Sequence, residues 1–164
     1  MAILDYTGIK KEGAAAIVPE LGKLLADLQI FYANMRGFHW NIKGKSFFAL
    51  HAKFEEQYDY LADKIDEVAE RILMLGGTPE NKFSEYLKIS SIKEVSGVSC
   101  KTEIINLILD SYRTIIAKER SIISLAGKYN DEATTSLLSD YLKDQEKTVW
   151  MLASYLATQC TDSK

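Results

Sequence analysis

The chain has 164 residues, of which 47% are hydrophobic and 26% charged, and its formal net charge is −3. These values are typical of a soluble globular protein with a substantial core, so we expect one domain over residues 1–164. The acidic balance disfavours binding to DNA or anionic membranes through bulk charge, and no apolar run is long enough to span a bilayer.

The beginning of the sequence and the cysteines bear on the expected location. The first residues, MAILDYTGIKKEG, lack the basic region followed by an apolar core that marks a secretory signal. Cys100 and Cys160 are far apart and form no pair with metal-site spacing. We therefore expect a cytoplasmic protein with free thiols.

The whole chain contains only two prolines and nine glycines, which is few for its length and predicts an all-α protein.

The first long helix follows a short N-terminal lead of mixed composition over residues 1–13. We expect this helix to begin at Pro19, which fits a first helical turn, or within residues 14–18, and to end near Lys43. Its apolar residues recur at steps of three and four and include Leu21, Leu24, Leu28, Phe31, Met35 and Phe38.

A second long helix follows a tight connection at residues 44–46. It is expected from Phe47 to about Leu75, where two consecutive glycines, Gly76 and Gly77, end it. The segment from there to about residue 101 is too long for a simple link between antiparallel neighbours. It is expected to carry a short helix at 83–89 and to cross the full height of a bundle.

Two more long helices are expected at residues 102–128 and 132–158, joined by a short turn. Isoleucine, leucine and tyrosine residues form the buried face of each. Four long helices with two short links and one long crossover define the ferritin-like four-helix bundle. This is the predicted fold, with the short helix carried on the crossover between the second and third long helices.

The second long helix carries four potential metal ligands. His51 and Glu55 are four residues apart and share a face, as do Asp66 and Glu70. All four lie on one stripe, but about 16 Å of helix separates the two pairs, whereas metal–ligand bonds are about 2 Å long. One chain cannot complete a site from these residues alone.

A second copy of this helix removes the difficulty. Antiparallel packing about a two-fold axis near residues 60–61 places His51 opposite Glu70 of the partner subunit, and Glu55 opposite Asp66 of the partner subunit. Such an isologous dimer contains two identical sites with mixed nitrogen and oxygen ligands. His39, at the end of the preceding helix, can fold over and supply a further nitrogen.

Other interpretations of the same residues stay open at this point. The acids can form a solvated face that pairs with Lys53, Lys64 and Arg71, and a lone histidine such as His39 is often structural. The sequence disfavours a ferritin-type site inside one bundle, because such a site needs Glu-x-x-His on two helices and the motif is absent. The residues three positions before the two histidines are arginine and phenylalanine.

A longer pattern points to a family. HWNIKGKSFFALHAKFEE followed by DEVAERILMLGGTP resembles the signature of the Dps family, mini-ferritins named as DNA-binding proteins from starved cells. The family pattern is His-Trp-Asn, a second His twelve residues on, an acid four later, then Asp-x-x-x-Glu. The matching positions are His39, His51, Glu55, Asp66 and Glu70. The family usually has Asp where this chain has Glu55, and the extra methylene can shift or weaken the second metal position.

The resemblance implies a ferroxidase. Fe(II) is oxidised to Fe(III), preferably by hydrogen peroxide, at di-iron sites shared between two-fold-related subunits, and ferric mineral is stored in a hollow homododecamer. His39, Asp66 and Glu70 would hold the first iron, with His39 from the subunit opposite the two acids. His51 and Glu55 would complete the second position. Imidazole and carboxylate ligands suit iron and also hold Zn, Mn or Co.

The resemblance also suggests roles outside the ligand set. Trp40 would lie near the metals and accept oxidising equivalents, although a plain interface aromatic is an equal alternative. The start of the last helix lines three-fold pores in this family, which makes Asp131, Asp140 and Asp144 candidate pore acids. Ordinary exposed acids are the alternative for these three.

DNA binding is expected to be weak or absent. Members of the family that compact DNA directly often carry a flexible lysine-rich tail, and phosphate binding depends on clustered positive charge. Here the two ends offer only Lys10, Lys11 and Lys164, each with acids nearby. A nucleoid-compacting DNA-binding protein with secondary iron binding is the alternative function, and a helical bundle of unrelated use is a third.

Overall fold

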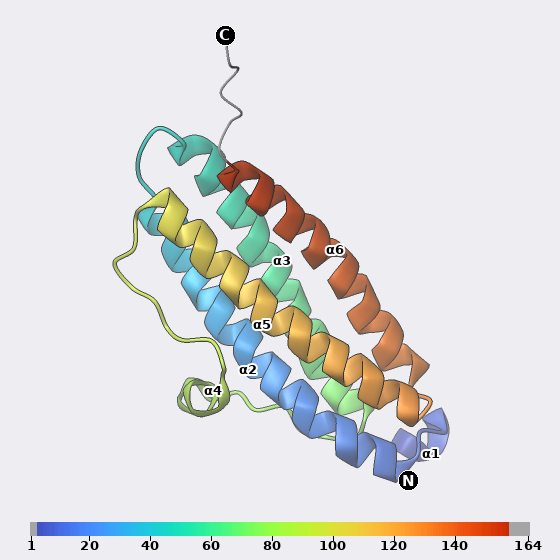
Figure 1. Cartoon of the computed structure of the whole chain (residues 1–164). Helices are drawn as coiled ribbons and strands as arrows, with labels where there is room; N and C mark the ends of the chain where they lie inside the picture. Colours follow the sequence, from blue (N-terminus) through green and yellow to red (C-terminus); the bar gives the residue numbers. More distant parts are fainter. Residues whose placement is uncertain (1–2, 158–164) are drawn as a thin grey trace.

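The computed structural model describes residues 3–157, and all their regular structure is helical (Figure 1). The helices are α1 (Ile3–Thr7), α2 (Lys11–Asn41), α3 (Phe47–Met74), α4 (Phe83–Ile89), α5 (Lys101–Lys128) and α6 (Glu132–Leu156). The four long helices pack as a bundle in which α2 contacts α3 and α5, and α5 contacts α6. The predicted ferritin-like arrangement is confirmed, and so is the short helix on the crossover.

Glycine and asparagine end two of the long helices in the same way. After α3, Gly76 has a φ of 77°, and the Gly77 amide donates to the Ile72 carbonyl at 2.9 Å. After α5, Asn130 has a φ of 55°, and the Asp131 amide donates to the Ala126 carbonyl at 3.0 Å. Both are Schellman motifs, which cap the last carbonyls of a helix and reverse the chain.

The N-terminal part of α2 differs from the sequence prediction. The helix begins at Lys11, so Pro19 lies inside it rather than in its first turn, and α1 occupies part of the predicted lead. An interior proline removes one helical hydrogen bond. The turns before it are nevertheless helical because Ala14 and Ile17 are buried in the core, at 3% and 0% exposure.

Asp27 attaches the crossover to the bundle. This side chain is fully buried on α2 and accepts hydrogen bonds from the Ser91 amide at 2.6 Å and the Ser90 hydroxyl at 2.9 Å. Lys118 of α5 forms an ion pair with its other oxygen. A buried charge is stable only when it is paired and hydrogen-bonded, and Asp27 fulfils both conditions by joining α2, α5 and the crossover.

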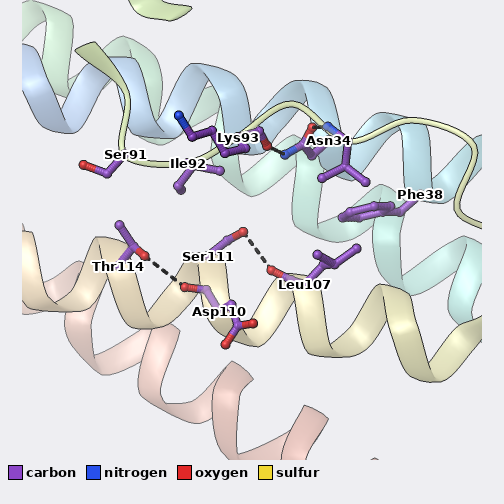
Figure 2. A pocket seen from close by; sticks show the side chains of 10 residues that line it. Asn34, Phe38, Ser91, Ile92, Lys93, Leu107, Asp110, Ser111 and Thr114 are labelled. Atoms are coloured by element: carbon purple, nitrogen blue, oxygen red, sulfur yellow. Dashed lines mark hydrogen bonds between the residues drawn. The ribbon is translucent and has the colours of Figure 1, made fainter. Parts of the chain in front are cut away.

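Asn34 makes a second attachment two turns further along α2. Its amide nitrogen donates to the Lys93 carbonyl at 2.8 Å (Figure 2). Its amide oxygen accepts from the Val95 amide at 2.9 Å. These bonds satisfy main-chain groups of a segment that has no helix partners of its own. A hollow of about 170 Å³ lies between this segment and α5, next to Ser111 and Thr114 (Figure 2).

No helix within residues 3–157 is both long enough and apolar enough to cross a membrane.

Candidate metal centre

The two histidines lie where α2 ends and α3 begins. His39 is in the last turn of α2, and His51 is in the second turn of α3. The short connection at residues 42–46 makes the two helices antiparallel neighbours, which places the side chains next to each other. His39 is buried, at 8% exposure, and His51 is half-buried.

The two imidazole rings form a reciprocal pair. Their centroids are 3.7 Å apart and their planes differ by 20°. His39 Nδ1 is 2.8 Å from the His51 carbonyl oxygen, and His51 Nδ1 is 2.8 Å from the His39 carbonyl oxygen. A carbonyl oxygen can only accept, so both Nδ1 atoms carry a hydrogen and donate. Each neutral ring therefore keeps its lone pair on Nε2, the form that a metal ion requires.

Aromatic side chains hold this pair from two sides. Phe47 stacks on His51 with centroids 4.9 Å apart, and Tyr58 meets His39 edge-on at 5.3 Å. The Tyr58 hydroxyl also reaches Glu55 Oε1 at 3.4 Å, a long hydrogen bond. Tyr58 was not predicted from sequence. Its position three residues after Glu55 on a helix is the signal that would have indicated it.

The three carboxylates of the predicted ligand set are exposed on α3. Glu55 lies one turn after His51, and Asp66 and Glu70 lie about three turns further along the same helix. The ion pairs found among the described residues do not include any of these three acids. Their carboxylates therefore face solvent, and Glu55 also accepts the hydrogen bond from Tyr58.

The lysines and the arginine that might have neutralised this face pair elsewhere. Lys53 pairs with Glu56, and Lys64 pairs with Glu67 at 2.8 Å. Arg71 turns inward and pairs with Asp131 at 2.6 Å. The solvated-face alternative allowed these cations to pair with the ligand-face acids, and the structure directs each of them to a different carboxylate.

One chain does not assemble the predicted site. Within residues 3–157, the His, Cys, Asp and Glu side chains nowhere form a group of three that could hold a metal ion. The structure brings His39 and His51 together but leaves Asp66 and Glu70 far down α3. This arrangement agrees with the geometric argument that the ligand set needs two chains, while the shared site itself stays a prediction.

The other sequence candidates have separate environments. Trp40 is 63% exposed, and the Arg36 guanidinium lies 4.8 Å from its ring centroid. Asp131 is buried and accepts hydrogen bonds from Arg71 and from the α6 backbone, so it acts as a structural cap rather than an exposed pore acid. Asp140 and Asp144 are exposed on α6, as pore acids would have to be.

The long-crossover bundle and the paired histidines at one end of it define a ferritin-like protein. The family described as the ferritin-like domain matches residues 19–159 of this chain. A DNA protection during starvation protein of Porphyromonas gingivalis is 52% identical over 93% of this chain and 96% of its own length.

Solved structures agree with the sequence comparison. The crystal structure of the Dps protein of Vibrio cholerae, described as a member of a broad superfamily of ferritin-like diiron-carboxylate proteins, matches with a TM-score of 0.89. It is 45% identical, over 91% of this chain and 94% of that one. A Bacillus brevis Dps structure matches with a TM-score of 0.85 at 32% identity, over 91% of this chain and 100% of its own. The chain belongs to the Dps family, as the histidine and acid pattern predicted.

Proposed function

We propose that this protein is an iron-storage and detoxification ferroxidase. It oxidises Fe(II), preferably with hydrogen peroxide, at di-iron sites shared between two-fold-related subunits, and it stores the ferric product in a hollow dodecamer. Membership of the family supports iron storage and DNA protection in general terms, and the ferritin-like diiron-carboxylate fold supports iron binding.

The observation that carries the proposal is the reciprocal histidine pair. Both Nδ1 atoms are engaged by main-chain carbonyls at 2.8 Å, which fixes the ring orientations and leaves both Nε2 lone pairs available to a metal ion. Histidines that bind metals commonly donate their other ring nitrogen in this manner.

The carboxylates would supply the remaining ligands of the proposed iron site. Asp66 and Glu70 of the partner subunit would meet His39, and Glu55 would lie with His51 at the second position. Hard carboxylate oxygens stabilise Fe(III) more than Fe(II), which favours oxidation. Two Fe(II) ions give one electron each to one hydrogen peroxide, so the O–O bond is reduced to two hydroxide ions and no hydroxyl radical is released.

The proposal is tested by Fe(II) oxidation in the full-length protein. The apo protein is loaded with Fe(II) without oxygen and then given hydrogen peroxide or air. We expect fast oxidation by peroxide, slow oxidation by air and a soluble ferric product in an assembly of twelve 18.5 kDa chains. Oxidation no faster than in protein-free buffer would overturn the proposal.

Two variants make this assay specific. Asp66→Asn removes one expected ligand and should abolish the rate advantage over buffer. Glu56→Gln is the matched control, because Glu56 is an exposed acid on the same helix that pairs with Lys53. Equal rates in the two variants would contradict the assigned ligand set.

A direct DNA role is the alternative. The family relatives are named for DNA protection, and protection by removing Fe(II) and peroxide needs no contact with DNA. With a net charge of −3 per chain, we expect no plasmid shift at moderate salt in a gel assay. A clear shift would favour the nucleoid-compacting function. A cytoplasmic location, expected from the sequence, is part of the main proposal.

A further inference from the structure

The centre of the bundle contains a cluster of polar side chains that the metal site does not use. Glu119 of α5 is fully buried, and Gln145 of α6 is 1% exposed. The Gln145 amide nitrogen donates to Glu119 Oε1 at 2.8 Å. Tyr60 of α3 lies beside both, so three of the four long helices contribute to the cluster.

Three atoms of this cluster are buried without a hydrogen-bond partner among the described residues. They are the Tyr60 hydroxyl, Glu119 Oε2 and Gln145 Oε1. Gln145 is close enough to the Tyr60 hydroxyl to lower its pKa, but no hydrogen bond of normal geometry joins them. Buried polar atoms are rarely left unpaired, because each would lose its hydrogen bonds to water without a replacement.

Within residues 3–157, no cation forms an ion pair with Glu119. The nearby groups on α3 are Tyr60, Glu67 and Lys64, and the Lys64 ammonium pairs with Glu67. Those on α5 and α6 are Tyr112, Tyr141 and Asp144. The buried face of α2 is apolar apart from Asn34 and Asp27, which bind the crossover, and His39 at its far end.

Burial therefore controls the charge of Glu119. It raises the pKa of this carboxyl from 4.5 to about 8, although the Gln145 hydrogen bond acts in the opposite direction. The side chain is thus mostly protonated at neutral pH. A protonated carboxyl offers an O–H donor in addition to its acceptor oxygen.

With Glu119 protonated, the three unpaired atoms comprise two hydrogen-bond donors and one acceptor. Protonated Glu119 and Tyr60 each have an O–H to donate, and Gln145 Oε1 accepts. One water molecule that accepts from the two hydroxyls and donates to the amide oxygen satisfies all three, and buried waters typically make about three such bonds. We propose that Glu119, Gln145 and Tyr60 form an internal binding site for one water molecule, built on a protonated Glu119 carboxyl, so that the stability of the bundle declines as the pH rises from acidic to weakly alkaline values.

The Glu119 carboxyl makes the stability of the fold depend on pH, because its pKa differs between the folded and unfolded states. In the unfolded chain this carboxyl ionises near 4.5, and in the fold near 8. The stabilisation is complete below pH 4.5 and declines as the pH rises towards 8. Over that interval the unfolding equilibrium constant rises by up to about tenfold per pH unit, because one proton is lost on unfolding.

The test uses the full-length assembled protein between pH 5 and 8, the range over which the Glu119 carboxyl is ionised in the unfolded chain and largely protonated in the fold. We expect the unfolding temperature of the wild type to fall with pH more steeply than that of Glu119→Gln, which keeps the shape of the side chain but cannot ionise. Glu103→Gln is the control, because Glu103 is an exposed acid on the same helix, and it should follow the wild type. Parallel profiles for the wild type and Glu119→Gln would overturn the proposal.

Two further measurements apply even if Glu119→Gln fails to assemble. The infrared spectrum of the wild type at pH 7 should contain the carbonyl stretch of a protonated carboxyl, which disappears above pH 9 and shifts in Tyr60→Phe. Absence of this band at pH 7 would contradict a protonated Glu119. A high-resolution crystal structure should show water bound to the three atoms, and direct contacts among them instead would contradict the water site.

Discussion

His39 and His51 hold each other's orientation through main-chain carbonyls rather than through their side chains. Each Nδ1 donates to the carbonyl oxygen of the other residue at 2.8 Å, and the rings stack at 3.7 Å. Because the backbone of position 51 is present in every variant, His39 keeps its hydrogen-bond acceptor when the His51 side chain is replaced. The two potential ligands are thus close in space but separable by mutation.

Because each histidine keeps its hydrogen bond when the other side chain is replaced, we expect single substitutions to affect one metal position at a time. His51→Phe keeps a ring for stacking and leaves the His39 bond in place, so we expect loss of the second metal position only. Titration with Co(II) without oxygen should show about half of the wild-type stoichiometry, since Co(II) accepts the same imidazole and carboxylate ligands. His39→Phe should weaken the first position at least about tenfold. Complete loss of binding in His51→Phe would contradict the assigned roles.

A shared site predicts that two inactive variants restore each other. In a dimer of one His39→Phe chain and one Asp66→Asn chain, one interface site has both ligands intact and the other has neither. Random co-assembly in equal amounts should recover roughly a quarter of the wild-type sites, because half of the dimers are mixed. The measurement is the initial rate of Fe(II) oxidation by peroxide after co-expression. Activity no higher than that of the separate variants would favour a site within one chain.

The helices were predictable because the signals that define them are local. Apolar spacing located all four long helices, and the 83–89 helix on the crossover has the predicted bounds. Gly76 and Gly77 end α3 as expected, through a left-handed residue and a Schellman motif. The start of α2 was wrong, since burial of Ala14 and Ile17 outweighs the preference of Pro19 for a first turn.

Buried polar residues were not predictable, because their partners lie on other helices. Asp27, Asp131 and Glu119 look like ordinary surface acids in the sequence. Their partners Lys118 and Arg71 are more than fifty residues away, so only tertiary packing reveals the pairs. The histidine and acid pattern located the candidate site, but whether it forms depends on a second chain, and the ligand set stays a prediction.

The buried pair of Arg71 and Asp131 predicts a large stability effect at the end of the bundle. Arg71 donates to Asp131 at 2.6 Å and to the Thr134 hydroxyl at 2.8 Å, while Asp131 accepts from the Thr134 amide at 3.0 Å and so caps α6. Asp131→Ala should lower the free energy of unfolding by about 3–5 kcal/mol, since it leaves a buried guanidinium unpaired and removes the cap.

Denaturant unfolding measures this effect, and two variants define its cause. Asp140→Ala alters an exposed acid on the same helix and should change stability by less than about 0.5 kcal/mol. The double variant Arg71→Met with Asp131→Ala should be more stable than Asp131→Ala alone, because no unpaired charge remains buried. A double variant less stable than Asp131→Ala would show that packing of the arginine, rather than its charge, dominates.

Gly77 and Gly22 are expected to respond in opposite ways to substitution by alanine. A Cβ on Gly77 would lie 2.7 Å from Val18 Cγ1 and 3.2 Å from the Ile72 carbonyl oxygen, whereas a Cβ on Gly22 would meet nothing within 4 Å. Gly77→Ala should therefore cost about 1–3 kcal/mol through overpacking against α2 and the end of α3. Gly22→Ala, inside helix α2, should stabilise the chain by about 0.5–1 kcal/mol because alanine loses less backbone entropy on folding. Thermal unfolding of the two variants and the wild type measures both effects. An unchanged or raised unfolding temperature for Gly77→Ala would show that α2 and α3 can separate at this end without loss of stability.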